Sequence, residues 1–291
     1  MLRVTQFSDT HFSTSDERSH GGFGYNTDET WDALFPHAFA SPNPPDLVVV
    51  TGDIADRGRV DEYVKAASKL GRIPVPANVC AGNHDFQLPF ESVLPRPQLT
   101  MSRTLRVADW LFVFADSNFA GREVGPDGRS RDREDRIHQN GRFGVDEMAW
   151  IVETIAGSDA PHAFMWVHHP PYSTGTFKSP AYDREMEELF AAAPKLRGGG
   201  AGHVHTDAKR VVGDRPVYIC PAFTINIDFD ARTLLPPGYR TYEFGDDGSV
   251  SSTCHLLDDE RWPRHRLPRP ALQWLSGEIS YDEMTSQLKL R

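Results

Sequence analysis

Residues 45–53, PDLVVVTGD, contain the stretch that decides the fold. The continuous apolar run from Leu47 to Val50 predicts a strand that is buried on both faces. Gly52 and Asp53 follow it at once, so a carboxylate stands at the end of the strand. Because sheets buried on both faces are covered by further layers, we expect a layered α/β protein.

Other apolar runs show the same arrangement of a strand that ends in a polar loop. They cover residues 2–9, 73–85, 110–117, 162–170 and, more weakly, 198–205. Helical patterns lie between them at residues 28–39 (interrupted at Pro36), 59–71 (ending at Gly71), 144–157 and 181–193. Consecutive strands follow at 208–220 and 240–257, where GDR and DDG resemble hairpin connections. Alternation that gives way to consecutive strands predicts sheets covered by helices.

The composition of the chain limits its function. The 291 residues are 39% hydrophobic and 25% charged, with a net charge of −10. An acidic chain argues against a sequence-independent nucleic-acid binder, which would show a basic surface. No apolar run approaches the roughly 20 residues that span a membrane, and the N-terminus lacks a signal-peptide pattern. Cys80, Cys220 and Cys254 have no zinc-type spacing, so we expect buried thiols in a cytoplasmic protein.

Residues that can bind metals gather at the ends of five strands. Asp9 and His11 are two positions apart on an extended chain, so their side chains point the same way. The full set is Asp9 and His11, Asp53, Asn83-His84-Asp85, His168-His169, and His203 with His205. Each motif alone is ordinary, since Gly, Asn and Asp form turns and single histidines are commonly structural. Five such motifs at strand ends together predict one site.

Histidines outside these motifs are interpreted as ordinary structural or surface residues. They are His20, His37, His138, His162, His255 and His265. His20 and His138 lie in loops 12–27 and 119–143, which we expect to contact a substrate, with Tyr25 and Asn26 as further candidates. For Asp56, Arg57 and Asp61, helix capping and a supporting role in the site remain equally open.

The ordered motifs DTH, GD, GNHD, HHPP and GHVH resemble those of the calcineurin-like metallophosphoesterase superfamily. The resemblance covers roughly residues 1 to 257. Within the superfamily, VVTGDIADRG, VHHPP, and PPGYR followed by DDGSV are similar to class III cyclic-nucleotide phosphodiesterases and glycerophosphodiesterases. Loops 12–27 and 119–143 match no pattern of these enzymes, which leaves the substrate open.

The resemblance implies a fold and a site. The fold would be a four-layer αββα sandwich of two mixed β-sheets flanked by helices, with two metal ions above the strand ends. Asp9, His11 and His205 would hold one ion, Asn83, His168 and His203 the other, and Asp53 would bridge both. His84 would be catalytic rather than a ligand, and Asp85 and His169 would be supporting residues.

Elementary chemistry agrees with this set. Imidazole, carboxylate and amide ligands suit Fe, Mn, Zn or Co, and the absence of thiolates argues against a structural zinc site. Two such ions generate a hydroxide at neutral pH and hold phosphoryl oxygens during in-line attack. With Asp9, Asp53 and one hydroxide, two divalent ions leave a net charge of about +1, which matches a phosphodiester monoanion.

The leading hypothesis is therefore a phosphodiesterase for a small soluble diester, a cyclic nucleotide or a glycerophosphodiester. A phosphomonoesterase or nucleotide pyrophosphatase on the same scaffold is the alternative, and a non-catalytic metal-binding scaffold is a third hypothesis. We expect a catalytic domain at residues 1–258. We expect residues 259–291 to be an appendage with a Pro/Arg-rich segment and one or two helices, docked on its own domain or forming a homo-oligomer interface.

Overall fold

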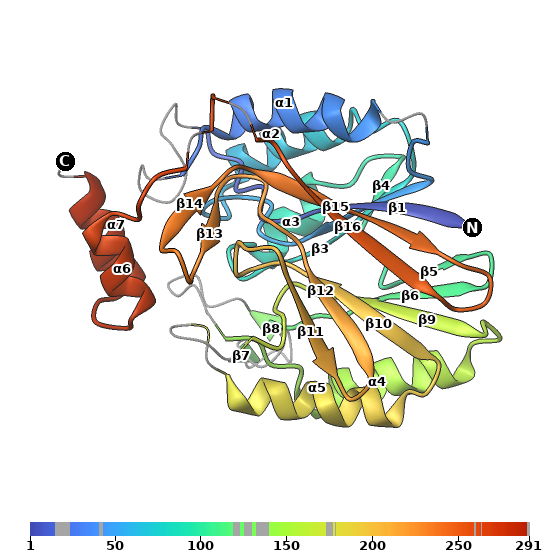
Figure 1. Ribbon diagram of the computed structural model, residues 1–291. Helices are drawn as coiled ribbons and strands as arrows, with labels where there is room; N and C mark the ends of the chain where they lie inside the picture. Colours follow the sequence, from blue (N-terminus) through green and yellow to red (C-terminus); the bar gives the residue numbers. More distant parts are fainter. Residues whose placement is uncertain are drawn as a thin grey trace.

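The computed structural model of the chain shows four layers, helix–sheet–sheet–helix (Figure 1). It describes residues 1–14, 24–40, 43–118, 123–124, 130–131, 140–172, 177, 179–258, 260–262 and 264–289. The predicted αββα sandwich of two mixed sheets is confirmed. His20 and His138, and most of loops 12–27 and 119–143, lie outside the described residues.

The first sheet has the strand order β16-β15-β1-β2-β3-β4. Its parallel strands are β1 (Leu2–Phe7), β2 (Leu47–Thr51), β3 (Ala77–Cys80) and β4 (Leu99–Thr100). β15 (Gly238–Phe244) pairs antiparallel with both β1 and the edge strand β16 (Val250–Leu256). Every residue of β2 is buried, as its unbroken apolar run predicts.

The second sheet has the strand order β11-β12-β10-β9-β6-β5. Its parallel strands are β6 (Trp110–Phe114), β9 (His162–Trp166), β10 (Leu196–Ala201) and β12 (Arg215–Ile219). The edge strands β5 (Thr104–Val107) and β11 (Ala208–Val212) pair antiparallel with their neighbours. The described residues also form two small antiparallel pairs: β7 (Glu123–Val124) with β8 (Ser130–Arg131), and β13 (Asn226–Asp228) with β14 (Thr233–Leu235).

Helices cover the outer face of each sheet. α1 (Thr27–Phe39), α2 (Val60–Leu70) and α3 (Gln87–Val93) share an apolar core with the first sheet. α4 (Gly144–Gly157) and α5 (Pro180–Ala192) do the same on the second sheet. The two inner faces meet in an aromatic layer, in which the rings of Phe164 and Phe244 lie edge to face with centroids 5.0 Å apart. This packing holds the carboxyl ends of β1, β2, β3, β9 and β10 at one end of the sandwich.

Two details differ from the sequence predictions. Pro36 does not interrupt α1, which continues to Phe39. Pro36 lies on the exposed face in the last turn, so water can donate to the Asp32 carbonyl in place of the missing backbone N–H. Cys80 and Cys220 are buried free thiols as expected, but Cys254 is a half-buried one because its edge strand is open on one side.

The C-terminal segment forms two helices, α6 (Arg269–Leu275) and α7 (Tyr281–Lys289), that dock on the rest of the chain. Trp262 is buried against the ring of Tyr25, with centroids 6.5 Å apart. Trp274 is buried against Phe177, with centroids 5.8 Å apart. The structure therefore shows docking on the chain's own domain, and the subunit interface stays a prediction that light scattering of residues 1–258 would test.

Candidate metal centre

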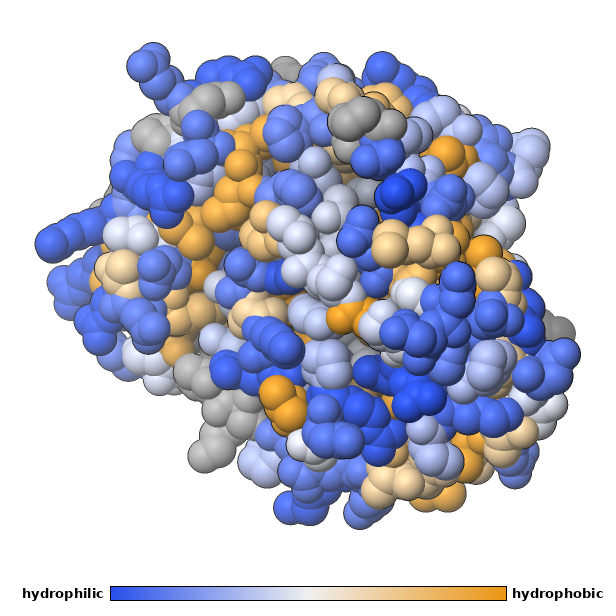
Figure 2. Space-filling model, turned by 45° about the vertical axis from the view of Figure 1, so that its right-hand side comes forward, coloured by the Kyte–Doolittle hydropathy of each residue, from blue (hydrophilic) through white to orange (hydrophobic). Residues whose placement is uncertain are grey.

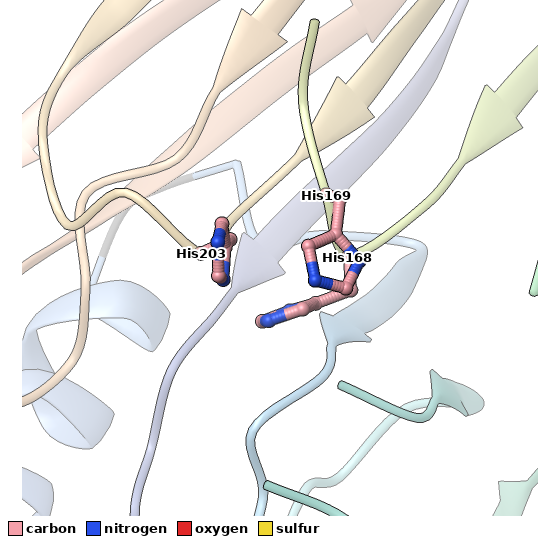
Figure 3. Close-up of side chains that lie close together, drawn as sticks. All are labelled: His168, His169 and His203. Atoms are coloured by element: carbon pink, nitrogen blue, oxygen red, sulfur yellow. The ribbon is translucent and has the colours of Figure 1, made fainter. Parts of the chain in front are cut away.

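The structure brings the predicted strand-end residues together. Asp9 and His11 follow β1, Asp53 follows β2, and Asn83 and His84 follow β3. His168 and His169 follow β9, and His203 and His205 follow β10, so the site is divided between the two sheets. Figure 3 shows the three imidazoles of His168, His169 and His203 converging from the second sheet. The site therefore depends on how one sheet is aligned on the other.

Among the residues that the structure describes, four overlapping groups of His and Asp side chains have ligand atoms within 4.8 Å of one another. They are Asp9-His11-His205, His11-Asp53-His84, Asp9-Asp53-His168 and His168-His169-His203. Asn83 adds an amide oxygen that lies 2.9 Å from Nε2 of His168. Nitrogen and oxygen donors without a thiolate are a set that first-row transition metals accept, so these residues fit the ions that the motifs imply.

Asp53 occupies the centre of this arrangement. Its Oδ2 lies 3.6 Å from Nε2 of His11 and 3.3 Å from Nε2 of His168. Within the other predicted ligand set, Oδ1 of Asp9 lies 3.3 Å from Nε2 of His205. One carboxylate therefore faces histidines from both predicted ligand sets.

Backbone carbonyls orient three of the imidazoles. Nδ1 of His168 lies 2.8 Å from the Thr51 carbonyl, Nδ1 of His205 lies 3.0 Å from that of Ile225, and Nδ1 of His84 lies 2.6 Å from that of Asp56. Because a carbonyl only accepts, each Nδ1 must carry the proton, and the lone pair of the neutral ring is on Nε2. This second hydrogen bond is what commonly fixes a histidine that binds a metal.

Backbone N–H groups orient the two carboxylates. The amide of His203 donates to both oxygens of Asp9, at 3.1 and 3.0 Å, and the amide of His84 donates to Oδ1 of Asp53 at 2.9 Å. Asp53 thus has one oxygen held by the protein and the other turned toward the histidines.

The loops that carry the site are strained. Of the seven non-glycine residues with positive φ in the described part of the chain, five are Asp9, His11, Asp53, His203 and His205. Such conformations cost free energy and persist where the surrounding structure imposes them, as at functional sites. Sequence reasoning placed these residues at strand ends but did not predict their left-handed backbone.

The charges in the site reinforce one another. Burial alone would raise the pKa of Asp9, but the imidazoles of His205 and His168 together outweigh burial and lower that pKa to about 2. Burial would likewise raise the pKa of Asp53, yet His168 and His84 hold it well below its usual value. Burial would lower the pKa of His168, and the Asp53 carboxylate raises it to about 9. Both aspartates are therefore ionised throughout the neutral range.

Asp85 joins two of the loops beneath the site. It accepts hydrogen bonds from the backbone amides of Ile54, Ala55 and Gly82, and from the hydroxyl of Tyr63 at 2.9 Å. Burial and the charge of Asp53 raise the pKa of Asp85 to about 6. Gly82 packs so closely that a Cβ there would lie 2.1 Å from Oδ1 of Asp53. The GNHD and GD loops are thus built as one unit.

His169 is held beside the site from three sides. Its Nδ1 lies 2.7 Å from the hydroxyl of Ser117, its carbonyl accepts from Tyr182 at 2.8 Å, and its ring centroid lies 4.4 Å from that of His203. Ser117, Tyr63 and Tyr182 were missed by sequence reasoning, because single hydroxyl residues carry no spacing signal.

The residues near the site whose roles the sequence left undecided make defined contacts in the structure. Oδ1 of Asp56 lies 3.5 Å from Nδ1 of His11, which is a supporting position. Asp61 accepts from Thr14 and from the amide of Glu62 at the start of α2. Arg57 is half exposed and pairs with Asp56 at 3.6 Å. Asn26 caps α1 by accepting from the amides of Asp28 and Glu29, and so has a structural role.

A family model described as calcineurin-like phosphoesterase matches residues 2–207. The chain belongs to the calcineurin-like phosphoesterase family. The predictions of this family and of a hydrolytic metallophosphoesterase are therefore confirmed, and the family implies divalent metal ions. Within the described ranges, none of the helices is long and apolar enough to cross a bilayer.

Curated relatives of this calcineurin-like phosphoesterase are named as phosphodiesterases. The 3′,5′-cyclic adenosine monophosphate phosphodiesterase CpdA of Escherichia coli K12 is 22% identical over 271 residues, which cover 90% of this chain and 92% of that protein. The glycerophosphodiester phosphodiesterase GpdQ of Enterobacter lignolyticus is 25% identical over 290 residues, which cover 95% of each.

Solved structures share the fold. The alignment with a dimetal phosphatase from Danio rerio has a TM-score of 0.59 at 14% identity, and it covers 88% of this chain and 98% of the phosphatase. GAP50, the anchor in the inner membrane complex of Plasmodium, has a TM-score of 0.56 at 13% identity and covers 91% of this chain and 88% of that one. At these identities the likeness concerns the fold alone.

Proposed function

We propose that this phosphoesterase hydrolyses a small phosphodiester, of the cyclic-nucleotide or glycerophosphodiester type, at a centre of two metal ions. Asp9, His11 and His205 would hold one ion, Asn83, His168 and His203 the other, and Asp53 both. The observation that carries the proposal is the Asp53 carboxylate, whose Oδ2 faces His11 and His168 from the two ligand sets.

The two ions would lower the pKa of water to give a nucleophile at neutral pH and would neutralise charge on the phosphoryl oxygens. The chain's own residues hold that arrangement rigid. The amides of His203 and His84 fix the carboxylates of Asp9 and Asp53, and the carbonyls of Thr51 and Ile225 fix the rings of His168 and His205.

His84 is suited to transfer a proton. Its Nδ1–H is engaged by the Asp56 carbonyl in either protonation state, so the proton that it exchanges is the one on Nε2. Protonated His84 would donate from Nε2 to the leaving oxygen as the P–O bond breaks. His84 is buried, and its ring stands edge to face with that of His11, with centroids 4.7 Å apart, so the direction of the ring is set.

Charge favours a diester over a monoester. Two divalent cations with Asp9, Asp53 and a hydroxide give a net charge of about +1, which a diester monoanion neutralises. A monoester dianion resembles the product and would bind between the ions without being turned over efficiently. The relatives named for cyclic AMP and for glycerophosphodiesters support the same substrate class.

The test compares bis-p-nitrophenyl phosphate with p-nitrophenyl phosphate on one manganese- or iron-loaded preparation, with cyclic AMP and a glycerophosphodiester alongside. We expect a higher kcat/KM for the diesters and loss of activity after chelation. Turnover of the monoester with none of the diesters would instead identify a phosphomonoesterase.

As a further proposal, the three free thiols support a cytoplasmic location.

A further inference from the structure

Gln6 is a buried polar residue near the carboxyl end of β1, and its side chain lies between the two sheets. Its side chain is wholly inaccessible to solvent. Its Nε2 donates to the hydroxyl of Thr51 at 2.6 Å and to the carbonyl of Ala201 at 3.0 Å. Its Oε1 accepts from the hydroxyl of Tyr242 at 2.5 Å. The amide therefore links β1 with β2 and β15 in its own sheet and with β10 in the opposite sheet.

The hydrogen bonds of Gln6 continue to the metal centre. Because the Thr51 hydroxyl accepts from Gln6, its own proton goes to Oγ of Ser8 at 2.8 Å, and the Ser8 hydroxyl donates to the Thr51 carbonyl at 3.2 Å. That same carbonyl accepts from Nδ1 of His168. This series of hydrogen bonds thus runs from Gln6 to the Thr51 carbonyl, which orients the proposed ligand His168.

The partners of Gln6 are also close in sequence to the proposed ligands. Ser8 precedes Asp9 directly, Thr51 stands two residues before Asp53, and Ala201 stands two residues before His203. Gly202, between Ala201 and His203, packs so tightly that a Cβ would lie 1.8 Å from Oγ of Ser8 and 2.6 Å from Oδ2 of Asp9. A shift between the sheets at Gln6 would therefore move both halves of the site.

We propose that Gln6 is a positioning residue that fixes the sheet carrying Asp9 and Asp53 against the sheet carrying His168 and His203. This inference rests on the proposed dinuclear site. An amide between two apolar sheets is costly unless it is bonded, and here three bonds satisfy it. The surrounding aromatic layer supplies cohesion without direction, whereas hydrogen bonds from one amide specify a single alignment.

The opposite end of the sandwich offers a matched control. Nε1 of Trp110, at the start of β6, donates to the carbonyl of Gly245 at 3.1 Å and so also joins the two sheets. Trp110→Phe removes this bond and keeps an aromatic ring in the same layer. Gln6→Leu removes the bonds of Gln6 with little change in volume, and Thr51→Val removes only the hydroxyl between Gln6 and Ser8.

The three variants of the full chain are compared with wild type in thermal unfolding, manganese affinity by chelator competition, and kcat and KM for bis-p-nitrophenyl phosphate. We expect Gln6→Leu to lower manganese affinity by about 10- to 100-fold, the usual effect of removing a residue that supports metal ligands. We expect kcat to fall more than KM rises, since misalignment of reacting groups costs rate. Thr51→Val should show the same pattern more weakly, and Trp110→Phe should lower the melting temperature alone.

Wild-type affinity and kcat in Gln6→Leu would overturn the inference, and so would losses in Trp110→Phe that match those of Gln6→Leu at equal loss of stability. If Gln6→Leu does not fold, Thr51→Val decides, and wild-type affinity and kcat in that variant would overturn the inference. Failure of the wild-type chain to bind manganese or to cleave the diester would count against the proposed function instead.

Discussion

The two ends of the sandwich differ in which residue types adopt the left-handed backbone conformation. At the end away from the metal centre, the hairpins β11–β12 and β15–β16 turn at Gly213, with φ of 63°, and Gly248, with φ of 85°. At the metal end, Gly52 also has a positive φ, of 86°, but five aspartate and histidine residues adopt the left-handed conformation as well, with φ between 41° for His11 and 73° for His203. Figure 2 views the molecule from nearer the glycine end, where hydrophilic residues are mixed with small hydrophobic patches.

The difference shows what each end is built for. Glycine enters the left-handed region without a steric cost, whereas an L residue pays roughly 1–2 kcal/mol. A turn that only reverses the chain can use glycine, as at Gly213, whose position has open space around it. A turn whose side chain must reach a metal ion cannot use glycine, because glycine has no side chain. The metal end therefore carries strain that hydrogen bonds to the carboxylates of Asp9 and Asp53 offset.

Removing a carboxylate at each end should give the largest contrast. Asp53→Ala removes the group that faces both ligand sets, so we expect almost complete loss of diesterase activity and reduced metal content. Asp246→Ala removes an exposed carboxylate that pairs with the N-terminus, and we expect activity near wild type. Two tightly bound metal ions and unchanged turnover in Asp53→Ala would refute the assignment of the bridge.

His84→Ala separates proton transfer from metal binding within the metal end. We expect metal content to stay near wild type and kcat to fall by roughly 10²–10⁴, the usual contribution of a general acid or base. The loss should be smaller for p-nitrophenolate leaving groups, which need little protonation. An equal loss for cyclic AMP and for bis-p-nitrophenyl phosphate would show that His84 stabilises charge or binds substrate instead.

A single methyl group tests the glycines of the two ends. In Gly82→Ala the new Cβ would meet Oδ1 and N of Asp53, at 2.1 and 2.3 Å, so the carboxylate must move. We expect activity to fall by about 10²-fold, since a misplacement of about 1 Å is enough for that loss. Gly213→Ala meets no atom within 4 Å and should cost about 1 kcal/mol of stability with activity unchanged. Equal activities of the two variants would contradict the close packing at Asp53.

The strand ends were predictable because their signal is local. The apolar run from Leu47 to Val50 predicts β2. Because parallel strands bring their carboxyl ends to one edge of a sheet, Asp9, Asp53 and Asn83 are expected to be neighbours. The division of the ligands between two sheets came from the family resemblance. The left-handed backbone of Asp9 and His203 was not predictable, because aspartate is an ordinary turn former and neither aspartate nor histidine requires a positive φ.

Other features depend on contacts between distant segments. Gln6 looks like an ordinary polar residue of a strand until β10 packs against it, 195 positions away in the sequence. The strands β4, β13 and β14 have only two or three residues, too few to show a periodicity. The predicted interruption at Pro36 was wrong because the effect of this proline on α1 depends on the exposure of the Asp32 carbonyl rather than on the proline itself.

The smallest effect is expected at a non-glycine residue of the far end. Ala108 turns the β5–β6 hairpin with φ of 50°, and its side chain is exposed. Ala108→Gly relieves the left-handed strain but adds freedom to the unfolded chain, so a net gain of up to about 1 kcal/mol is expected, or a few degrees in melting temperature. The measurement should include a chelator so that bound metal does not mask the change, and activity of the reloaded enzyme should be unchanged. A clear loss of stability would mean that positive φ in this chain is not strained, and the contrast between the two ends would then rest on the choice of side chains alone.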